Sequence, residues 1–593
     1  MDVVVAVARH LTESGLKMKT KVRKEKRDWL SNIGGWSVTK HGICLYINPA
    51  APTSFSSLCA LDIEDDERGN FVGIGIFDGT SCYYWSDWEL VSKLTIPPFI
   101  AHNGRTDLDK LKKWGFKVDE SFLIYDTQLM AHIIDSSRRM YGLKALAKAD
   151  LGIEYPSYEE LTGKKTSKDH VTLDKLDLTL VAEYNACDCY STYKLFEKQR
   201  DSIAVGMCLN TQHYYETLEK PSAFVFQAME QRGIMLDIPY ATELQAKLKA
   251  QKEPIKAAIE NELGAINLNS PKQLLGALNA KGIKPFFKGK GSTDKRALDS
   301  LRHLPIVRDL LSYSEIETLL SSFVEPYLQR QTEVVRPHYN QCGTRTGRPS
   351  CSDPNLLQIP RRTENGRLVR RMFIARPGHL FGDADFGQIE PRLLAHFSKD
   401  EKLCRLFNEG SDFHNFTASN LGIDRERAKI LNLSVGYRAT YKSVGAQLKC
   451  RPFEAQEEID RWWAMFPDLW DWQQKLIYES KKTGYCTTLM GRRIKVEDLE
   501  HGNQWRREGA ERQLINNIIQ GSAAEVMKLG MIACDKAGIN LLVQIYDELL
   551  YEEKEADIEA ATEVVIQCME KAVKLDVPLV VEAHIGPNWS EVH

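Results

Sequence analysis

The stretch F-G-D-A-D-F-G-Q-I-E-P-R, which runs from Phe381 to Arg392, decides how the C-terminal half of this chain folds. Its buried-type residues predict a short strand, and the chain breaks at Gly387 before it resumes as a helix. Asp383 and Asp385 are two residues apart and therefore project from the same face of the strand. A carboxylate at a strand end suits a hard cation such as Mg²⁺, although a single one more often caps a helix or joins an ion pair.

A second acidic stretch, Q-I-Y-D-E-L-L from Gln544 to Leu550, changes that balance. Two adjacent carboxylates interrupt an apolar run, which is the pattern of a hairpin that presents Asp547 beside Asp385. Paired carboxylates on neighbouring strands could hold two cations and support an in-line phosphoryl displacement. The two stretches together therefore predict a two-metal active site.

These stretches resemble the first and last polymerase motifs of family A DNA polymerases, D-Y-S-Q-I-E-L-R and Q-V-H-D-E-L. The resemblance implies that Asp385 and Asp547 bind two Mg²⁺ ions, for which Mn²⁺ could substitute. Gln388 and Glu390 would line the nucleotide site, and Glu390 would fill the space that a ribose 2′-hydroxyl needs. The resemblance further implies an α+β right-hand polymerase domain, with the thumb at 211–335, the palm at 336–410 and 506–593, and the fingers at 411–505.

Three short motifs in the N-terminal part carry further acids: D-x-E at Asp62 and Glu64, N-x-x-x-D ending at Asp107, and Y-x-x-x-D at Tyr184 and Asp188. Each motif alone is common and usually structural or solvated. Together and in this order they resemble the DEDD 3′→5′ proofreading exonucleases. The resemblance implies two more Mg²⁺ ions held by the four carboxylates, with the tyrosine orienting the attacking water. It also implies an α/β, RNase H-like mixed sheet with helices at 56–210, after an N-terminal extension at 1–55.

A basic stripe is predicted in the fingers, where Arg425, Lys429, Leu433 and Tyr437 are spaced by four along one helix. R-x-x-x-K alone is usually a solvated helix face, but this run resembles the third polymerase motif of the family. The resemblance implies that Arg425, Lys429 and the preceding His414 bind the triphosphate, and that Lys429 assists pyrophosphate departure. Tyr437 would lie by the templating base. Leu433 stands where the family has an aromatic residue, so we expect altered discrimination among modified sugars.

A third group of residues matches family positions that contact primer and template, largely through the minor groove. Tyr546 replaces a histidine, which keeps a hydrogen-bonding hydroxyl but removes titration near neutral pH. The predicted DNA-binding residues are Arg348, Asn355, Gln358, Arg512, Asn516, Gln520, Gln544 and Tyr546.

Composition limits the class of protein without defining it. The net charge of −3 leaves DNA binding to local basic surface, and no apolar run is long enough to cross a bilayer. Thirteen cysteines without a C-x-x-C pair argue against a disulfide framework or structural zinc. Residues 1–55 are best explained as a solvated tail, with an organellar transit sequence as the alternative. We expect a monomer that is not secreted, in the cytoplasm of a phage-infected bacterium or in an organelle matrix.

The sequence thus predicts a template-directed DNA polymerase with a proofreading exonuclease, acting on primer-template DNA and dNTPs. Nothing resembles the 5′-nuclease domain of bacterial DNA polymerase I, so we expect a phage or organelle replicase that meets a helicase and primase. One alternative is a single-subunit RNA polymerase, which shares the palm but which Glu390 argues against. The other is a nuclease whose C-terminal half only binds DNA.

Overall fold

The structure is a computed structural model that describes residues 37–50, 55, 58–202, 211–287, 289–330, 332–361 and 363–592. The chain forms two compact units. Unit 1 comprises the described residues of Met1–Tyr125 together with Gly142–Glu197, and unit 2 comprises Asp126–Tyr141 and Lys198–His593. Most of the predicted N-terminal extension lies outside the described residues. The exception is a short segment that contains Cys44–Ile47, which forms strand β1 of unit 1.

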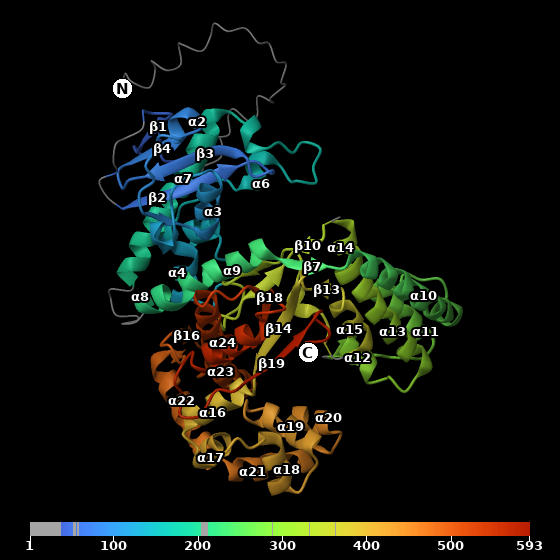
Figure 1. The fold of residues 1–593 in the computed structure, drawn as a ribbon. Coiled ribbons are helices and arrows are strands. Elements are labelled where there is room, and N and C mark those ends of the chain that lie inside the picture. Colours follow the sequence, from blue (N-terminus) through green and yellow to red (C-terminus); the bar gives the residue numbers. More distant parts are fainter. Residues whose placement is uncertain are drawn as a thin grey trace. The chain divides into compact units, whose positions relative to one another are not determined.

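Unit 1 is built on a six-stranded sheet in the order β1-β4-β3-β2-β5-β6 (Figure 1). Its middle strands are antiparallel, whereas β1 pairs parallel to β4 and β2 pairs parallel to β5. Helix α7 (Leu178–Ser202) follows the strands in the chain, and α3 (Arg105–Lys113) follows β5. The other strands are β2 (Cys59–Asp65), β3 (Phe71–Phe77), β4 (Ser81–Trp85), β5 (Phe99–Ala101) and β6 (Leu123–Asp126).

Unit 2 is centred on a four-stranded antiparallel sheet in which β14 (His379–Phe386) lies between β18 (Glu548–Lys554) and β19 (Val581–Gly586). β17 (Leu541–Ile545) completes the sheet. Along the chain, α16 (Ile389–Ser398) follows β14 and α23 (Gln504–Lys536) precedes β17. Helix α24 (Ile558–Glu570) connects β18 to β19. The sheet therefore joins strands that are about 200 residues apart in sequence.

Two further groups of helices flank the strands of unit 2 in sequence (Figure 1). One group precedes β14, and the other lies between β14 and β17. The first group contains α9 (Lys220–Arg232), α10 (Ile238–Leu263), α11 (Pro271–Ala280), α13 (Pro305–Leu319) and α14 (Glu325–Gln329); the second contains α17 (Glu401–Asn408), α18 (Phe413–Leu421), α19 (Arg425–Val435), α20 (Tyr441–Leu448), α21 (Pro452–Met465) and α22 (Pro467–Thr483).

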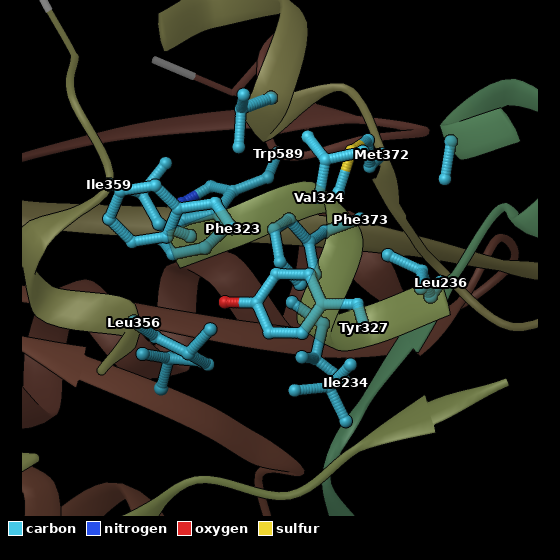
Figure 2. Close-up of a cluster of buried hydrophobic side chains, with 14 of the residues drawn as sticks. Ile234, Leu236, Phe323, Val324, Tyr327, Leu356, Ile359, Met372, Phe373 and Trp589 are labelled. Carbon is cyan, nitrogen blue, oxygen red and sulfur yellow. The ribbon is translucent and has the colours of Figure 1, made fainter. Parts of the chain in front are cut away.

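The main apolar core of unit 2 joins the first helical group to the sheet. Figure 2 shows this cluster around Tyr327 and Phe373. The ring of Phe373 meets Tyr327 edge-on at 5.7 Å and Trp589 at 5.4 Å between ring centroids. Phe373 and Trp589 are fully buried. The cluster fixes the C-terminal residues of the chain beside helices that lie far earlier in the sequence.

Segment Asp126–Tyr141 belongs to unit 2, although unit 1 contains the residues on both sides of it. It carries α4 (Thr127–Ile134), which Asp126 caps through its side chain. The Nε2 atom of His132 lies 2.8 Å from the carbonyl oxygen of Thr344, and Gln199 donates a hydrogen bond to the carbonyl oxygen of Thr127 at 2.9 Å. The chain therefore enters unit 2 for one helix and then returns to unit 1.

Two predictions from composition can be compared with the described part of the chain. Its twelve cysteines are all free, which agrees with the expected lack of a disulfide framework. Within the described ranges, no helix combines the length and apolar character needed to span a membrane.

Candidate active sites

The two carboxylates predicted to bind metal in unit 2 come from a strand and from a turn at its end. Asp385 lies in β14 directly opposite Glu548, the first residue of β18. Tyr546 and Asp547 form the turn between β17 and β18, and the Phe386 N–H donates to the Asp547 carbonyl oxygen at 3.1 Å. The predicted hairpin is confirmed, and it brings Asp547 to the end of the strand that carries Asp385.

Burial and mutual repulsion dominate the electrostatics of this pair. Burial, followed by the charges of Asp547 and Glu548, raises the pKa of Asp385 to about 7. Burial also raises the pKa of Asp547. Arg361 Nη1 lies 3.9 Å from Asp385 Oδ2, and Asp385 Oδ1 is buried without a hydrogen-bond donor among the described residues. The oxygen donors and the repulsion between them fit a divalent cation such as Mg²⁺.

Asp383 and Glu548 form a second, deeper acidic pair. Asp383 is 2% exposed, and burial raises its pKa to about 8, while a hydrogen bond with Glu548 acts in the opposite direction. Arg370 Nη1 lies 3.9 Å from Glu548 Oε1, and its guanidinium stacks 4.6 Å from the ring centre of Trp589. Arg370 could not be predicted from the sequence, because nothing in a run of basic residues marks the one that is buried.

Glu390 is held between two donors from different elements. The Tyr437 hydroxyl donates a short hydrogen bond to Glu390 Oε2, and Arg348 Nη2 donates to Oε1 at 2.8 Å. Both bonds fix the carboxylate next to the turn that begins α16, where Gln388 adopts a left-handed conformation with φ of 55°. Three predicted site residues therefore meet at one point, although they were assigned to different roles.

Gln544 and Tyr546 approach this region from the hairpin. Gln544 Nε2 donates to the Tyr546 carbonyl oxygen at 2.6 Å, and the Gln544 N–H donates to the Tyr339 hydroxyl at 3.1 Å. Tyr546 is 52% exposed, and the Arg348 guanidinium lies 5.8 Å from its ring centre. A buried amide and an exposed aromatic ring thus lie at the turn that carries Asp547.

The basic stripe in the fingers differs in one respect from its prediction. Helix α19 carries Arg425, Lys429 and Leu433, but it ends at Val435, so Tyr437 lies beyond the helix. The prediction of one helix through all four residues is wrong, because Gly436 ends the helix and the Tyr437 N–H turns back to the Ser434 carbonyl oxygen at 3.2 Å. From this turn, the Tyr437 hydroxyl donates its hydrogen bond to Glu390.

His414 and Arg425 are both held by neighbouring side chains. Arg425 Nη2 lies 2.9 Å from Asp412 Oδ2, and His414 Nδ1 lies 3.0 Å from Asn432 Nδ2. Burial lowers the pKa of His414, which favours the neutral ring. Asn432 also accepts hydrogen bonds from Thr417 and Trp462. This buried asparagine was not predicted, and only its position on the inner face of the predicted helix could have suggested it.

The remaining predicted DNA contacts lie on two elements of unit 2. Arg512, Asn516 and Gln520 are half-buried and fall on one face of α23, as their spacing predicts. The Asn355 side chain accepts a hydrogen bond from the Leu357 N–H at 3.2 Å and caps a short 3₁₀ turn, and Gln358 is exposed at the end of that turn. Asn355 thus has a structural use in addition to its predicted contact.

In unit 1, three of the predicted carboxylates lie close together. Oxygen atoms of Asp62, Glu64 and Asp188 all lie within 4.8 Å of one another. Asp62 and Glu64 share one face of β2, and Asp188 comes from α7. Asp107, on α3, is buried but lies outside this group. The cluster matches three of the four predicted ligands, and its donor atoms fit a hard divalent cation.

Asn185 bridges this cluster and was not predicted. Its Nδ2 donates to Asp62 Oδ2 at 2.8 Å and lies 3.3 Å from Glu64 Oε1. Gly75 lies opposite Asp62 on β3, where any Cβ atom would come within 1.6 Å of Asn185 Oδ1. Burial, then the charge of Asp188, raises the pKa of Asp62 to about 7, and burial also raises the pKa of Glu64.

Lys144 and Tyr155 complete the site and were also missed. The Lys144 ammonium donates a short hydrogen bond to Asp188 Oδ1, and the Tyr155 hydroxyl donates to the same oxygen at 2.6 Å. Lys144 Nζ lies 4.3 Å from the ring centre of Tyr184. Both residues lie far from the acidic motifs in sequence, so no local spacing could have linked them to Asp188.

The fold and the paired carboxylates of unit 2 are those of the polymerase class of proteins. The family described as DNA polymerase family A matches residues 238–591. The chain belongs to this family.

Named relatives agree with that assignment. DNA polymerase I of Rhizobium leguminosarum is 31% identical over 529 residues, which are 83% of this chain and 51% of the relative. DNA polymerase I of Chloroflexus aurantiacus is 33% identical over 526 residues, covering 84% and 55%. The thermostable DNA polymerase I of Thermus aquaticus is 37% identical over 398 residues, covering 63% and 48%. The chain thus spans about half the length of these relatives.

A solved structure covers nearly the whole chain. The POL domain of Pol1 from M. smegmatis, in complex with DNA primer-template and dNTP, superposes with a TM-score of 0.80 at 26% identity, covering 92% of this chain and 100% of that one. The predicted fold, an N-terminal α/β mixed-sheet domain followed by a polymerase domain, is therefore confirmed.

Proposed function

We propose that this chain is a DNA-dependent DNA polymerase that extends a primer 3′ end with dNTPs. The observation that carries the proposal is the position of Asp547, in the turn that adjoins the end of the β14 strand bearing Asp385. Membership of DNA polymerase family A and the similarity to a structure in complex with DNA primer-template and dNTP support it.

Asp385 and Asp547 are the residues that would hold Mg²⁺ or Mn²⁺. When bound, two such cations would stabilise the attacking and leaving oxygens of an in-line displacement at the α-phosphate. Asp383 and Glu548 lie behind them and support the strand pair. Arg361, which faces Asp385, offsets part of the repulsion between the carboxylates.

The fingers helix would bind the triphosphate. Arg425 and Lys429 lie one turn apart on α19, and Arg425 is oriented by its ion pair with Asp412. His414 is favoured as a neutral ring and can donate a single hydrogen bond to a phosphate oxygen. Lys429 would place its charge where pyrophosphate departs.

Glu390 would exclude ribonucleotides because two hydrogen bonds prevent it from swinging away from the sugar. This rigidity argues against the alternative of an RNA polymerase. Leu433 is 51% exposed on the same helix as the phosphate-binding residues, and it offers an aliphatic surface where the family has a ring.

DNA contacts would extend the site on two sides. Arg512, Asn516 and Gln520 on α23 form one polar face for the primer-template, and Gln544 and Tyr546 would approach the primer end from the hairpin. Arg348, Asn355 and Gln358 would test the minor groove without reading sequence.

We further propose that unit 1 is a 3′→5′ proofreading exonuclease. The grouping of Asp62, Glu64 and Asp188 supports this, since these oxygens would hold divalent cations that supply hydroxide and stabilise the leaving oxygen. Tyr184, one turn before Asp188 on the same side of α7, would orient the water. Asp107 would join as the fourth carboxylate. We also propose that the enzyme copies phage or organelle DNA together with a helicase and primase.

A single gel assay tests both activities. The purified chain is incubated with a primer-template that carries a mismatched 3′ end, with Mg²⁺, and with or without dNTPs. We expect mismatch removal in both reactions and extension only with dNTPs. Asp385→Ala should abolish extension and keep removal, whereas Asp62→Ala combined with Glu64→Ala should do the reverse. Extension by Asp385→Ala would refute the assignment of the polymerase site.

A further inference from the structure

Lys144 is a positively charged side chain inside the carboxylate cluster of unit 1. It lies on the short helix α5 (Leu143–Leu146), directly after the point where the chain returns to unit 1. Its ammonium forms an ion pair with Asp188, whose side chain is 6% exposed, while the Lys144 side chain itself is 27% exposed. The lysine therefore reaches a buried carboxylate from the open side of the site.

Three residues fix the position of this ammonium. Asp188 Oδ1 accepts hydrogen bonds from both Lys144 and Tyr155. The rings of Tyr155 and Tyr184 lie 4.6 and 4.3 Å from Lys144 Nζ, within the range of cation–π attraction. An ammonium that contacts one carboxylate and two aromatic rings has a fixed position, unlike that of a solvated lysine side chain.

The charge balance of the cluster shows what the ammonium does there. Asp62, Glu64 and Asp188 offer oxygens within 4.8 Å of one another, and Asn185 donates to two of them without adding charge. Lys144 offsets part of their repulsion, since its charge opposes the rise in the pKa of both Asp62 and Glu64, whereas the charge of Lys110 opposes only that of Asp62. A divalent cation would need the same carboxylate oxygens.

We propose that Lys144 is a built-in counter-ion of the exonuclease cluster, and that a divalent cation must displace its ammonium from Asp188 in order to bind. The proposal rests on the proposed exonuclease function only in taking the cluster as a metal site. Lys144 would thereby hold the three carboxylates together before metal arrives and would weaken metal binding. In this sense it is a positioning residue.

Mn²⁺ binding tests the proposal without a reaction. Titrations by electron paramagnetic resonance would use the full chain carrying Asp385→Asn and Asp547→Asn, so that the polymerase site does not contribute. Lys144→Met should bind Mn²⁺ roughly three- to thirty-fold more tightly, because a unit positive charge close to the bound cation is removed. Lys144→Arg, which keeps the charge, should stay near the parent. The matched control is Lys148→Met, one turn away, where the lysine pairs with exposed Glu154 at 2.6 Å.

Unchanged or weaker Mn²⁺ binding by Lys144→Met, in protein with native far-ultraviolet circular dichroism, would overturn the proposal. Adding Glu64→Gln to each protein identifies the signal from this cluster. Binding by neither the parent nor Lys144→Met at the cluster would overturn both the counter-ion and the metal site. Tighter binding by Lys144→Met without any mismatch removal by the wild type would support the counter-ion and refute only the proposed exonuclease.

Discussion

Single side chains in this protein act through the partners that hold them. Glu390 illustrates this at the proposed sugar-selecting position, because its two carboxylate oxygens are bound by Tyr437 and Arg348 from separate parts of unit 2. A free glutamate could rotate away from a ribose at little cost, whereas this one would lose two charge-assisted hydrogen bonds.

Glu390→Ala should therefore admit ribonucleotides. We expect the ratio of rNTP to dNTP incorporation efficiency to rise on the order of ten- to a hundred-fold, because the excluding group is gone. Single-nucleotide extension with matched rNTP and dNTP measures the ratio. Glu401→Ala, at an exposed position on α17, is the control. An unchanged ratio in Glu390→Ala would remove this residue from sugar selection.

Both candidate sites contain residues that the sequence predicts and residues that it could not predict. Asp385, Asp547, Asp62, Glu64 and Asp188 lie in short motifs, so their type and spacing can be read locally. Lys144, Asn432 and Arg370 take part through contacts with residues far away in the chain. Such contacts depend on tertiary packing, which leaves no periodic signal in one sequence.

The helices and strands likewise include some that the sequence predicts and some that it does not. The β17–β18 hairpin and the strand before Gly387 follow from apolar runs and turn chemistry, so they could be predicted. The end of α19 could not be predicted, because the four-residue spacing of the motif continues to Tyr437 whereas the helix ends at Val435. In unit 1, the edge strand β1 was not predicted, because Cys44–Ile47 is an apolar run of only four residues and a run this short does not distinguish a strand from other structure.

The aromatic core between the helices and the sheet of unit 2 should be sensitive to truncation. Phe373→Ala should lower the free energy of unfolding of unit 2 by about 3–5 kcal/mol, because the lost ring leaves a cavity between Tyr327 and Trp589. Denaturant unfolding followed by tryptophan fluorescence measures this change. Phe286→Ala, at a residue that is 63% exposed, should cost far less. Equal losses in the two variants would contradict the packing.

Helix α4 should make unit 2 sensitive to acid. Burial, followed by the charge of Arg492, holds the pKa of His132 well below its usual value of 6.5. The unfolded chain then binds the extra proton first, so stability is present above pH 6.5 and is lost as pH falls below it. We expect a loss of up to about 1.4 kcal/mol per pH unit below 6.5.

Denaturant unfolding of unit 2 between pH 7.5 and 5.5 measures this slope. His132→Gln cannot be protonated, so its stability should fall less over the same range. His584→Gln, at an exposed position of β19, serves as the control and should keep the wild-type slope. If His132→Gln and the wild type lose stability in parallel, the buried imidazole is not the cause.

At the scale of the whole molecule, the two units are not consecutive in the chain. Unit 2 contains Asp126–Tyr141, and His132 of that segment contacts Thr344 and lies 3.4 Å from Arg492. A fragment that begins at residue 211 would retain every proposed polymerase residue but would lose α4. Its loss would leave the Thr344 carbonyl oxygen and the Arg492 guanidinium without this partner.

We therefore expect the fragment 211–593 to unfold at a lower temperature than unit 2 of the full chain. Adding a peptide that spans 126–141 should restore part of the difference, since it replaces the missing contacts. Differential scanning calorimetry of the fragment, with and without the peptide, measures both effects. A scrambled peptide of the same composition is the control. Equal melting temperatures for fragment and full-length unit 2 would show that α4 adds nothing.

The passage of the chain through α4 also restricts how the two units could have been exchanged during evolution. A gene segment that encodes unit 1 alone cannot be cut out or inserted as one uninterrupted piece, because it would carry along a helix that belongs to its neighbour. Homologous recombination within this lineage should therefore favour crossovers that keep residues 126–141 with their native acceptor surface. Chimaeras joined at residue 210 would inherit a helix and a docking surface from different parents.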